Sequence, residues 1–138
     1  MNVLFVCHGN INRSAAAEII SQQLRPDLTV KSCGVKTWPG RITAKKTRQT
    51  LEERGYNGQG IRSTPIDQQL VDWADRIYLM DGGNSKRYYQ EWNKPAEQLA
   101  TLTQAATRIP DPTWCRDRTQ HHQMIDLLEE AVKSIPYE

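Results

Sequence analysis

Residues 2–14 read NVLFVCHGNINRS. The first six of these residues form a short and almost wholly apolar run, which is typical of a parallel strand buried on both faces. Good helix formers follow from Ser14 to Leu24, where apolar residues recur at four-residue spacing. Residues 8–13, called the anion loop below, are therefore predicted to join the carboxyl end of a strand to the first turn of a helix.

Apolar runs and helical patterns continue to alternate along the chain. Further strands are predicted at Thr29–Ser32, Ile77–Met80 and Leu99–Leu102. Further helices are predicted at Thr43–Arg54, from the capping sequence Ser63-Thr64-Pro65 onward, at Asn84–Trp92 and at His121–Ile135. This alternation favours an α/β domain built on a parallel sheet, and we expect residues 1–138 to form a single domain.

The composition excludes several classes of protein. Hydrophobic residues make up 38% and charged residues 25% of 138 residues, and the net charge is only +2, so neither disorder nor binding to nucleic acid or a membrane surface is expected. No apolar run approaches the roughly 20 residues that span a bilayer. The three cysteines (Cys7, Cys33 and Cys115) form no C-x-x-C pair, which favours a reducing, cytoplasmic setting.

The anion loop and its flanks have the pattern C-x(5)-R-S, from Cys7 to Ser14. A short loop that opens into a helix presents free backbone N–H groups to an anion, and the helix dipole adds to the attraction. Gly9 allows close backbone approach or unusual dihedral angles, and Arg13 offers a bidentate fork for phosphate oxygens. The same positive field would favour the thiolate of Cys7, with Ser14 donating to the sulfur, and so create a nucleophile beneath a bound phosphate.

The segment VCHGNINRS closely resembles the V-C-x-G-N-x-C-R-S motif of the low-molecular-weight protein-tyrosine-phosphatase family. Residues 30–34, 75–81 and 109–112 resemble the family's second strand, third strand and acid loop. The resemblance implies a single-domain, three-layer α/β fold with a four-stranded parallel sheet in flavodoxin-like order and helices on both faces. It also implies that Asn10 braces the loop from within. The residues with an implied phosphate-binding or supporting role are His8, Gly9, Asn10, Ile11, Asn12 and Ser14.

Asp111 is the candidate general acid. A phenolate is a poor leaving group because phenol has a pKa near 10, so hydrolysis of phosphotyrosine benefits from a carboxylic acid above the leaving oxygen. Asp111 lies between Pro110 and Pro112, in a stiff loop that resembles the D-P loop of the family. Residues 109–113 are called the acid loop below. Trp38 and Trp114 are candidates for the walls of the substrate pocket.

The chain departs from the family motif at two positions near the predicted site. Asn12 stands where the family has a second loop cysteine, which can form a protective disulfide with the nucleophile, so this route of reversible oxidation should be absent. Thr113 stands where the family has an aromatic residue after D-P, which leaves peptide preference open. Neither change removes a group that hydrolysis requires.

The predicted function is therefore hydrolysis of phosphotyrosine in proteins, or of small phosphomonoesters, through a cysteinyl-phosphate on Cys7, with Arg13 as clamp and Asp111 as acid and base. No cofactor or metal is implied. Two alternatives stay open: an arsenate reductase of the same fold, which needs a second cysteine able to reach Cys7, and a non-catalytic phosphopeptide-binding module, which needs neither nucleophile nor acid.

Overall fold

A parallel sheet of four strands forms the centre of the protein in the computed structural model, which describes residues 1–104 and 106–137. The strand order is β2-β1-β3-β4, and each neighbouring pair is parallel. The strands are β1 (Asn2–Cys7), β2 (Thr29–Gly34), β3 (Arg76–Leu79) and β4 (Glu97–Gln98). This is the flavodoxin-like order, so the prediction of the fold class is confirmed.

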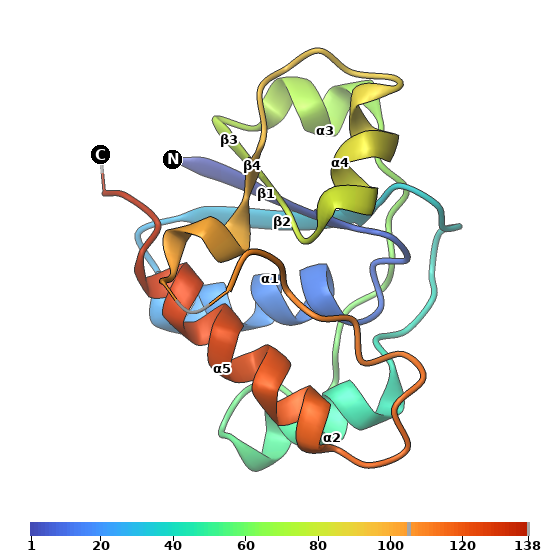
Figure 1. Cartoon of the computed structure of the whole chain (residues 1–138), viewed down its shortest axis with the longest axis vertical. Coiled ribbons are helices and arrows are strands. Elements are labelled where there is room, and N and C mark those ends of the chain that lie inside the picture. The colour runs from blue at the N-terminus through green and yellow to red at the C-terminus, as the bar shows by residue number, and fades with distance from the viewer. Residues whose placement is uncertain (105, 138) are drawn as a thin grey trace.

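Helices cover both faces of the sheet and give the molecule three layers (Figure 1). One face carries α1 (Arg13–Leu24) and α5 (Thr119–Lys133), and the other carries α3 (Gln68–Trp73) and α4 (Gly82–Tyr89). The remaining α-helix of the described residues, α2 (Lys45–Glu53), lies beside α5. No helix in the described ranges has the length and apolar character needed to cross a membrane.

Strand β1 is buried on both faces, as its apolar run predicts. Val3, Phe5 and Cys7 contribute to the core beneath α1 and α5, whereas Leu4 and Val6 contribute to the core beneath α3 and α4. Successive side chains of a strand point to opposite faces, so this division follows directly from the strand geometry. The strand therefore delivers its last residue, Cys7, to the carboxyl edge of the sheet at the centre of the fold.

Two predicted elements differ from the structure. Residues 63–65 do not start a helix: Pro65 forms a parallel bridge with Gly34, and the helix α3 begins later, where the Asp67 side chain accepts a hydrogen bond from the N–H of Leu70. The predicted strand Leu99–Leu102 is a short 3₁₀ helix, η1. The fourth strand is the residue pair immediately before it, β4, which pairs with β3.

Candidate active site

The backbone of the anion loop is oriented by hydrogen bonds to its outer side. The carbonyl oxygens of Cys7, His8 and Ile11 accept hydrogen bonds from the N–H groups of Val35, Lys36 and Ala44, at 3.0, 2.9 and 2.8 Å. A trans peptide places its N–H opposite its C=O, so the N–H groups that follow these carbonyls point the other way, toward the inside of the loop. The loop is thus held as a ring of inward-facing donors, which suits an anion.

Asn10 fixes the shape of the loop from within. It has a positive φ of 58°, the left-handed conformation that asparagine tolerates better than most residues, whereas Gly9 does not adopt it. The buried side chain of Asn10 donates from Nδ2 to Ser14 Oγ at 2.8 Å and to Ser32 Oγ at 2.9 Å, and its Oδ1 accepts from the N–H of Thr64 at 2.9 Å. One amide therefore joins three segments of the chain to the loop.

Cys7 lies at the bottom of the loop and is buried. Its Sγ is 2.9 Å from Ser14 Oγ, and the N–H of Asn10 donates to it at 3.3 Å. These two contacts fix the position of the sulfur beneath the loop. The contact between Ser14 and the sulfur is the one that the sequence predicts.

Gly34, at the end of β2, allows the sheet to approach the loop closely. A Cβ at this position would lie 2.8 Å from the carbonyl oxygen of His8 and 3.1 Å from the nitrogen of Asn10. Both are backbone atoms, which cannot move aside as the end of a side chain can. A glycine is therefore required where β2 supports the anion loop.

Arg13 is buried and held by two groups. Its Nη1 donates to Oδ2 of Asp81 at 2.6 Å and to the carbonyl oxygen of Ile109 at 3.1 Å. Its Nη2 lies 3.6 Å from Oδ2 of Asp111. The guanidinium group is thereby fixed at the opening of the loop, between the end of β3 and the acid loop.

The acid loop is connected to both the sheet and the anion loop. The N–H of Ile109 donates to the carbonyl oxygen of Met80 at 2.8 Å, immediately after β3. Further along, Oδ1 of Asp111 accepts from the backbone N–H of Thr113 at 3.1 Å and from the Thr113 hydroxyl. That hydroxyl in turn accepts from Asn12 Nδ2 at 3.1 Å. The Asp111 carboxyl group is thus held at the same cavity that Cys7 lines.

These groups share one cavity of about 250 Å³. Trp114 belongs to the lining although it is 93% exposed. Trp38 does not line the cavity itself, but its ring lies 4.3 Å from the guanidinium of Arg41, which does. The lining residues are Cys7, His8, Gly9, Ile11, Asn12, Arg13, Arg41, Asp111, Thr113 and Trp114. Of the predicted site residues, Asn10 and Ser14 lie behind this surface as supports.

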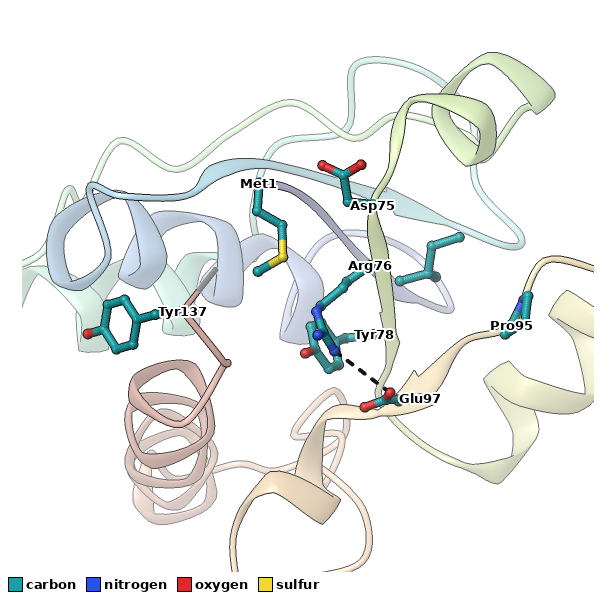
Figure 2. Close-up of a pocket in the computed structure, with 8 residues that line it drawn as sticks. Met1, Asp75, Arg76, Tyr78, Pro95, Glu97 and Tyr137 are labelled. Atoms are coloured by element: carbon teal, nitrogen blue, oxygen red, sulfur yellow. Dashed lines mark ion pairs between the residues drawn. The ribbon is translucent and has the colours of Figure 1, made fainter.

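A larger cavity, of about 400 Å³, lies at the other end of the strands (Figure 2). Figure 2 shows Met1 beside the start of β1, and Arg76 and Glu97 at the starts of β3 and β4. Ligands of open α/β sheets bind at the carboxyl ends of the strands, so the smaller cavity above Cys7 is the candidate active site.

Residues 2–136 match the family model for low molecular weight phosphotyrosine protein phosphatase. The chain belongs to this family. The proteins of this family are phosphatases, and the candidate site of this chain brings a cysteine, an arginine and a carboxyl group to one cavity.

Named relatives agree with the placement of this phosphatase in the family. A protein-arginine-phosphatase of Geobacillus stearothermophilus is 29% identical over 96% of both chains. A low molecular weight protein-tyrosine-phosphatase of Acinetobacter johnsonii is 32% identical over 80% of this chain and 79% of its own length. Among solved structures, a protein tyrosine phosphatase from Entamoeba histolytica with Hepes in the active site superposes with a TM-score of 0.87 at 26% identity, covering 97% of this chain and 93% of that one.

Asp81 and Arg41 belong to the candidate active site, although neither was among the predicted site residues. Burial alone would raise the pKa of Asp81, but the hydrogen bonds from Arg13 and from the N–H of Asn84 outweigh it, and the pKa lies below its usual value. The position of Asp81 at the carboxyl end of β3 was a usable signal, because β3 is the neighbour of β1. Arg41 is one of several basic residues that follow Trp38 in the sequence (Arg41, Lys45, Lys46 and Arg48), and its spacing did not single it out.

Proposed function

We propose that this phosphatase hydrolyses phosphotyrosine in proteins, and small aryl phosphates, with Cys7 as nucleophile, Arg13 as phosphate clamp and Asp111 as general acid and base. The observation that carries the proposal is the arrangement around one cavity: the sulfur of Cys7 lies beneath the loop amides, and Nη2 of Arg13 lies 3.6 Å from the carboxyl oxygen of Asp111. A phosphate group seated in the loop would contact all three.

In the first step, the thiolate of Cys7 attacks phosphorus, the S–P bond forms and the bond from phosphorus to the tyrosine oxygen breaks. Asp111 gives its proton to that oxygen, so tyrosine leaves neutral. In the second step, Asp111 takes a proton from water, the water oxygen bonds to phosphorus and the S–P bond breaks. Inorganic phosphate and the Cys7 thiolate result, while the loop amides and Arg13 stabilise the equatorial oxygens in both steps.

The cavity walls support tyrosine over arginine as the phosphorylated residue. Ile11 offers an apolar side chain, Trp114 an aromatic ring, and Arg41 a cation at the opening. The guanidinium of Arg41 already lies over the ring of Trp38, and the same contact is available to the neutral ring of a tyrosine substrate. A phosphoarginine side chain would instead bring a second guanidinium next to Arg41, which is unfavourable for like charges.

The second candidate, arsenate reduction, finds little support in the cysteines. It needs a thiol that can reach the sulfur of Cys7. Cys33 is buried in the core on the opposite face of the sheet, with Leu4 and Val6. The thiol of Cys115 is directed to Gln120, with Sγ 2.7 Å from Oε1. The third candidate, a phosphopeptide-binding module without turnover, gives Cys7 and Asp111 no chemical role.

We also propose a reducing compartment such as the cytoplasm as the place of action. The three cysteines are free, and the proposed nucleophile works only as a free thiol. The proposed partners are proteins that carry phosphotyrosine, with no role assigned to nucleic acid, membranes or a cofactor.

The test is hydrolysis of p-nitrophenyl phosphate between about pH 5 and pH 7 in the presence of EDTA. We expect turnover by the wild type and none by Cys7→Ser, while the matched control Cys115→Ser keeps the wild-type rate. Asp111→Ala should lose about 10²- to 10⁴-fold on substrates with a poor leaving group, and less on p-nitrophenyl phosphate, whose leaving group is good. Turnover by Cys7→Ser would contradict the mechanism.

The choice of phosphorylated residue is tested separately with a phosphotyrosine peptide and a phosphoarginine peptide of the same sequence. We expect phosphate release from the first to be at least about tenfold faster. Arg41→Ala should release phosphate faster from the phosphoarginine peptide and so reduce the ratio between the two rates. Equal rates on both peptides would contradict the preference for tyrosine.

A further inference from the structure

The two positions near the predicted site at which the chain departs from the family motif are hydrogen-bonded to each other. Asn12 Nδ2 donates to Thr113 Oγ1 at 3.1 Å, although the residues are 101 positions apart in the sequence. Asn12 belongs to the anion loop and Thr113 to the acid loop. Two changes that seem unrelated in the sequence therefore form one contact between the two halves of the site.

The contact is part of a chain of hydrogen bonds with a fixed direction. The hydroxyl of Thr47 donates to Asn12 Oδ1 at 2.6 Å. Asn12 Nδ2 donates to the Thr113 oxygen, and the Thr113 hydroxyl donates to Asp111 Oδ1. Asn12 and Thr113 each accept on one side and donate on the other, so the orientation of the Asn12 amide is determined by its two partners. The chain ends on the carboxyl group that the proposed function uses as acid.

The side chain of Asn12 is free for this role because it does not cap the helix that it precedes. Asn12 is the N-cap residue of α1, a position where asparagine commonly accepts a hydrogen bond from the first helical N–H groups. Here its side chain makes no such bond. The first N–H groups of α1 therefore stay available to the anion, while the amide holds the acid loop.

The two ends of this chain of hydrogen bonds differ in burial. Thr47 is fully buried and Asn12 is 5% exposed, whereas Thr113 and Asp111 are exposed. The neighbour of Thr47 on α2, Lys46, donates from Nζ to the carbonyl oxygen of Cys115 at 3.0 Å and to that of Arg116. Helix α2 thus holds the segment around Asp111 at two points, one through Asn12 and one directly.

We propose that Asn12 and Thr113 are positioning residues that hold the carboxyl group of Asp111 over the leaving oxygen. The proposal rests on the proposed function of Asp111. Fixing the acid in place matters because proton transfer requires hydrogen-bond distance and correct orientation in the transition state. The benefit should be greatest for substrates whose leaving group needs the proton most.

The test measures kcat and KM for phenyl phosphate, which has a poor leaving group, and for p-nitrophenyl phosphate, which has a good one. Thr113→Val keeps the shape of the side chain and removes its hydroxyl. We expect kcat to fall about tenfold on phenyl phosphate and less than about threefold on p-nitrophenyl phosphate, with KM unchanged on both. Thr113→Ser should restore most of the rate, and the matched control Thr101→Val, at an exposed threonine of η1, should change neither.

A second variant tests whether Asn12 acts through Thr113. Asn12→Ala alone should reproduce the selective loss on phenyl phosphate, and in the Thr113→Val background it should add less than about twofold. If the double variant instead loses the product of the two single-variant losses, Asn12 does not act through Thr113, and the linked role is overturned. Thr113 is exposed, so Thr113→Val should not disturb the fold. A loss of kcat that is equal on both substrates, or no loss, in this variant would overturn the positioning role of Thr113.

The two proposals fail in different ways. Wild-type enzyme that hydrolyses neither substrate would overturn the proposed function and the positioning role with it. Wild-type turnover that depends on Cys7, combined with an unchanged leaving-group sensitivity in Thr113→Val, would overturn the positioning role alone.

Discussion

Arg13 and Asp81 form an ion pair at the edge of the cavity, with Nη1 and Oδ2 2.6 Å apart. The same carboxylate accepts from the N–H of Asn84 at 2.8 Å through its other oxygen and so caps α4. One side chain therefore fixes both the guanidinium group and the start of a helix. The position of the proposed phosphate clamp is set by β3 and α4 rather than by the anion loop alone.

Replacing Asp81 separates these two tasks. Asp81→Asn keeps a good helix cap but removes the charge that holds Arg13. We expect kcat on p-nitrophenyl phosphate to fall about tenfold with little change in the free energy of unfolding. Asp67→Asn is the matched control, because Asp67 caps α3 in the same way and contacts no arginine of the site. Equal kinetic behaviour of the two variants would argue against an orienting role for Asp81.

Gly34→Ala should disturb the anion loop from the outside. The added methyl group would lie 2.8 Å from the carbonyl oxygen of His8, so the loop or β2 must shift. We expect a loss of about 1–3 kcal/mol in the free energy of unfolding, together with a loss of turnover. Urea unfolding and p-nitrophenyl phosphate hydrolysis measure both. Gly82→Ala, where a Cβ meets nothing within 4 Å, is the control that should keep both values.

Oxidation of Cys7 should be irreversible under excess hydrogen peroxide. Asn12 removes the neighbouring thiol of the family motif, and Cys33 is separated from Cys7 by the sheet itself. The sulfur should therefore proceed to the sulfinic acid instead of forming a disulfide. Mass spectrometry should find two added oxygen atoms on Cys7, and dithiothreitol should not restore activity. A disulfide-linked peptide containing Cys7 and Cys33 would contradict this prediction. As a control, the Cys33→Ala variant should lose activity in hydrogen peroxide at the same rate as the wild type.

The free energy of unfolding should fall as the solution becomes mildly acidic, and His121 should account for part of the change. Burial lowers the pKa of His121, and the positive charges of Lys46 and Arg118 lower it further. Below the ordinary histidine pKa of about 6.5, the unfolded chain therefore takes up a proton that the folded protein resists. Urea unfolding from about pH 7.5 to 5.5 should show a flatter pH dependence for His121→Gln. The control Thr101→Val should keep the wild-type dependence of unfolding free energy on pH. If His121→Gln also keeps it, His121 is not responsible for the loss of stability in acid.

The sequence predicted the elements whose signal is local. The apolar run of β1 and the helix formers of α1 leave few alternatives, and both elements lie within one residue of the prediction. Residues 63–65 misled the prediction because a hydroxyl followed by proline is compatible with an extended segment as well as with a helix start, and the bridge to Gly34 selects the extended form. Leu99–Leu102 misled it because a buried 3₁₀ turn has the same apolar composition as a strand.

The site was predictable where its residues are adjacent and not where they meet across the fold. The loop from Cys7 to Ser14 forms a continuous motif, so its chemistry can be inferred from spacing. The pairs Arg13–Asp81 and Asn12–Thr113 join residues 68 and 101 positions apart. Such pairs have no characteristic spacing, because they depend on how the strands and loops come together.

The outward hydrogen bonds of the loop carbonyls have a consequence for how substrate choice can evolve in this fold. Main-chain N–H groups, together with the charge of Arg13, make the interior of the loop attractive to negative charge. Substitutions at His8 or Ile11 can alter which group accompanies the phosphate into the cavity, but they leave the preference for an anion in place. The attraction for an anion therefore depends mainly on the shape of the loop backbone, and the side chains around it can vary without removing it.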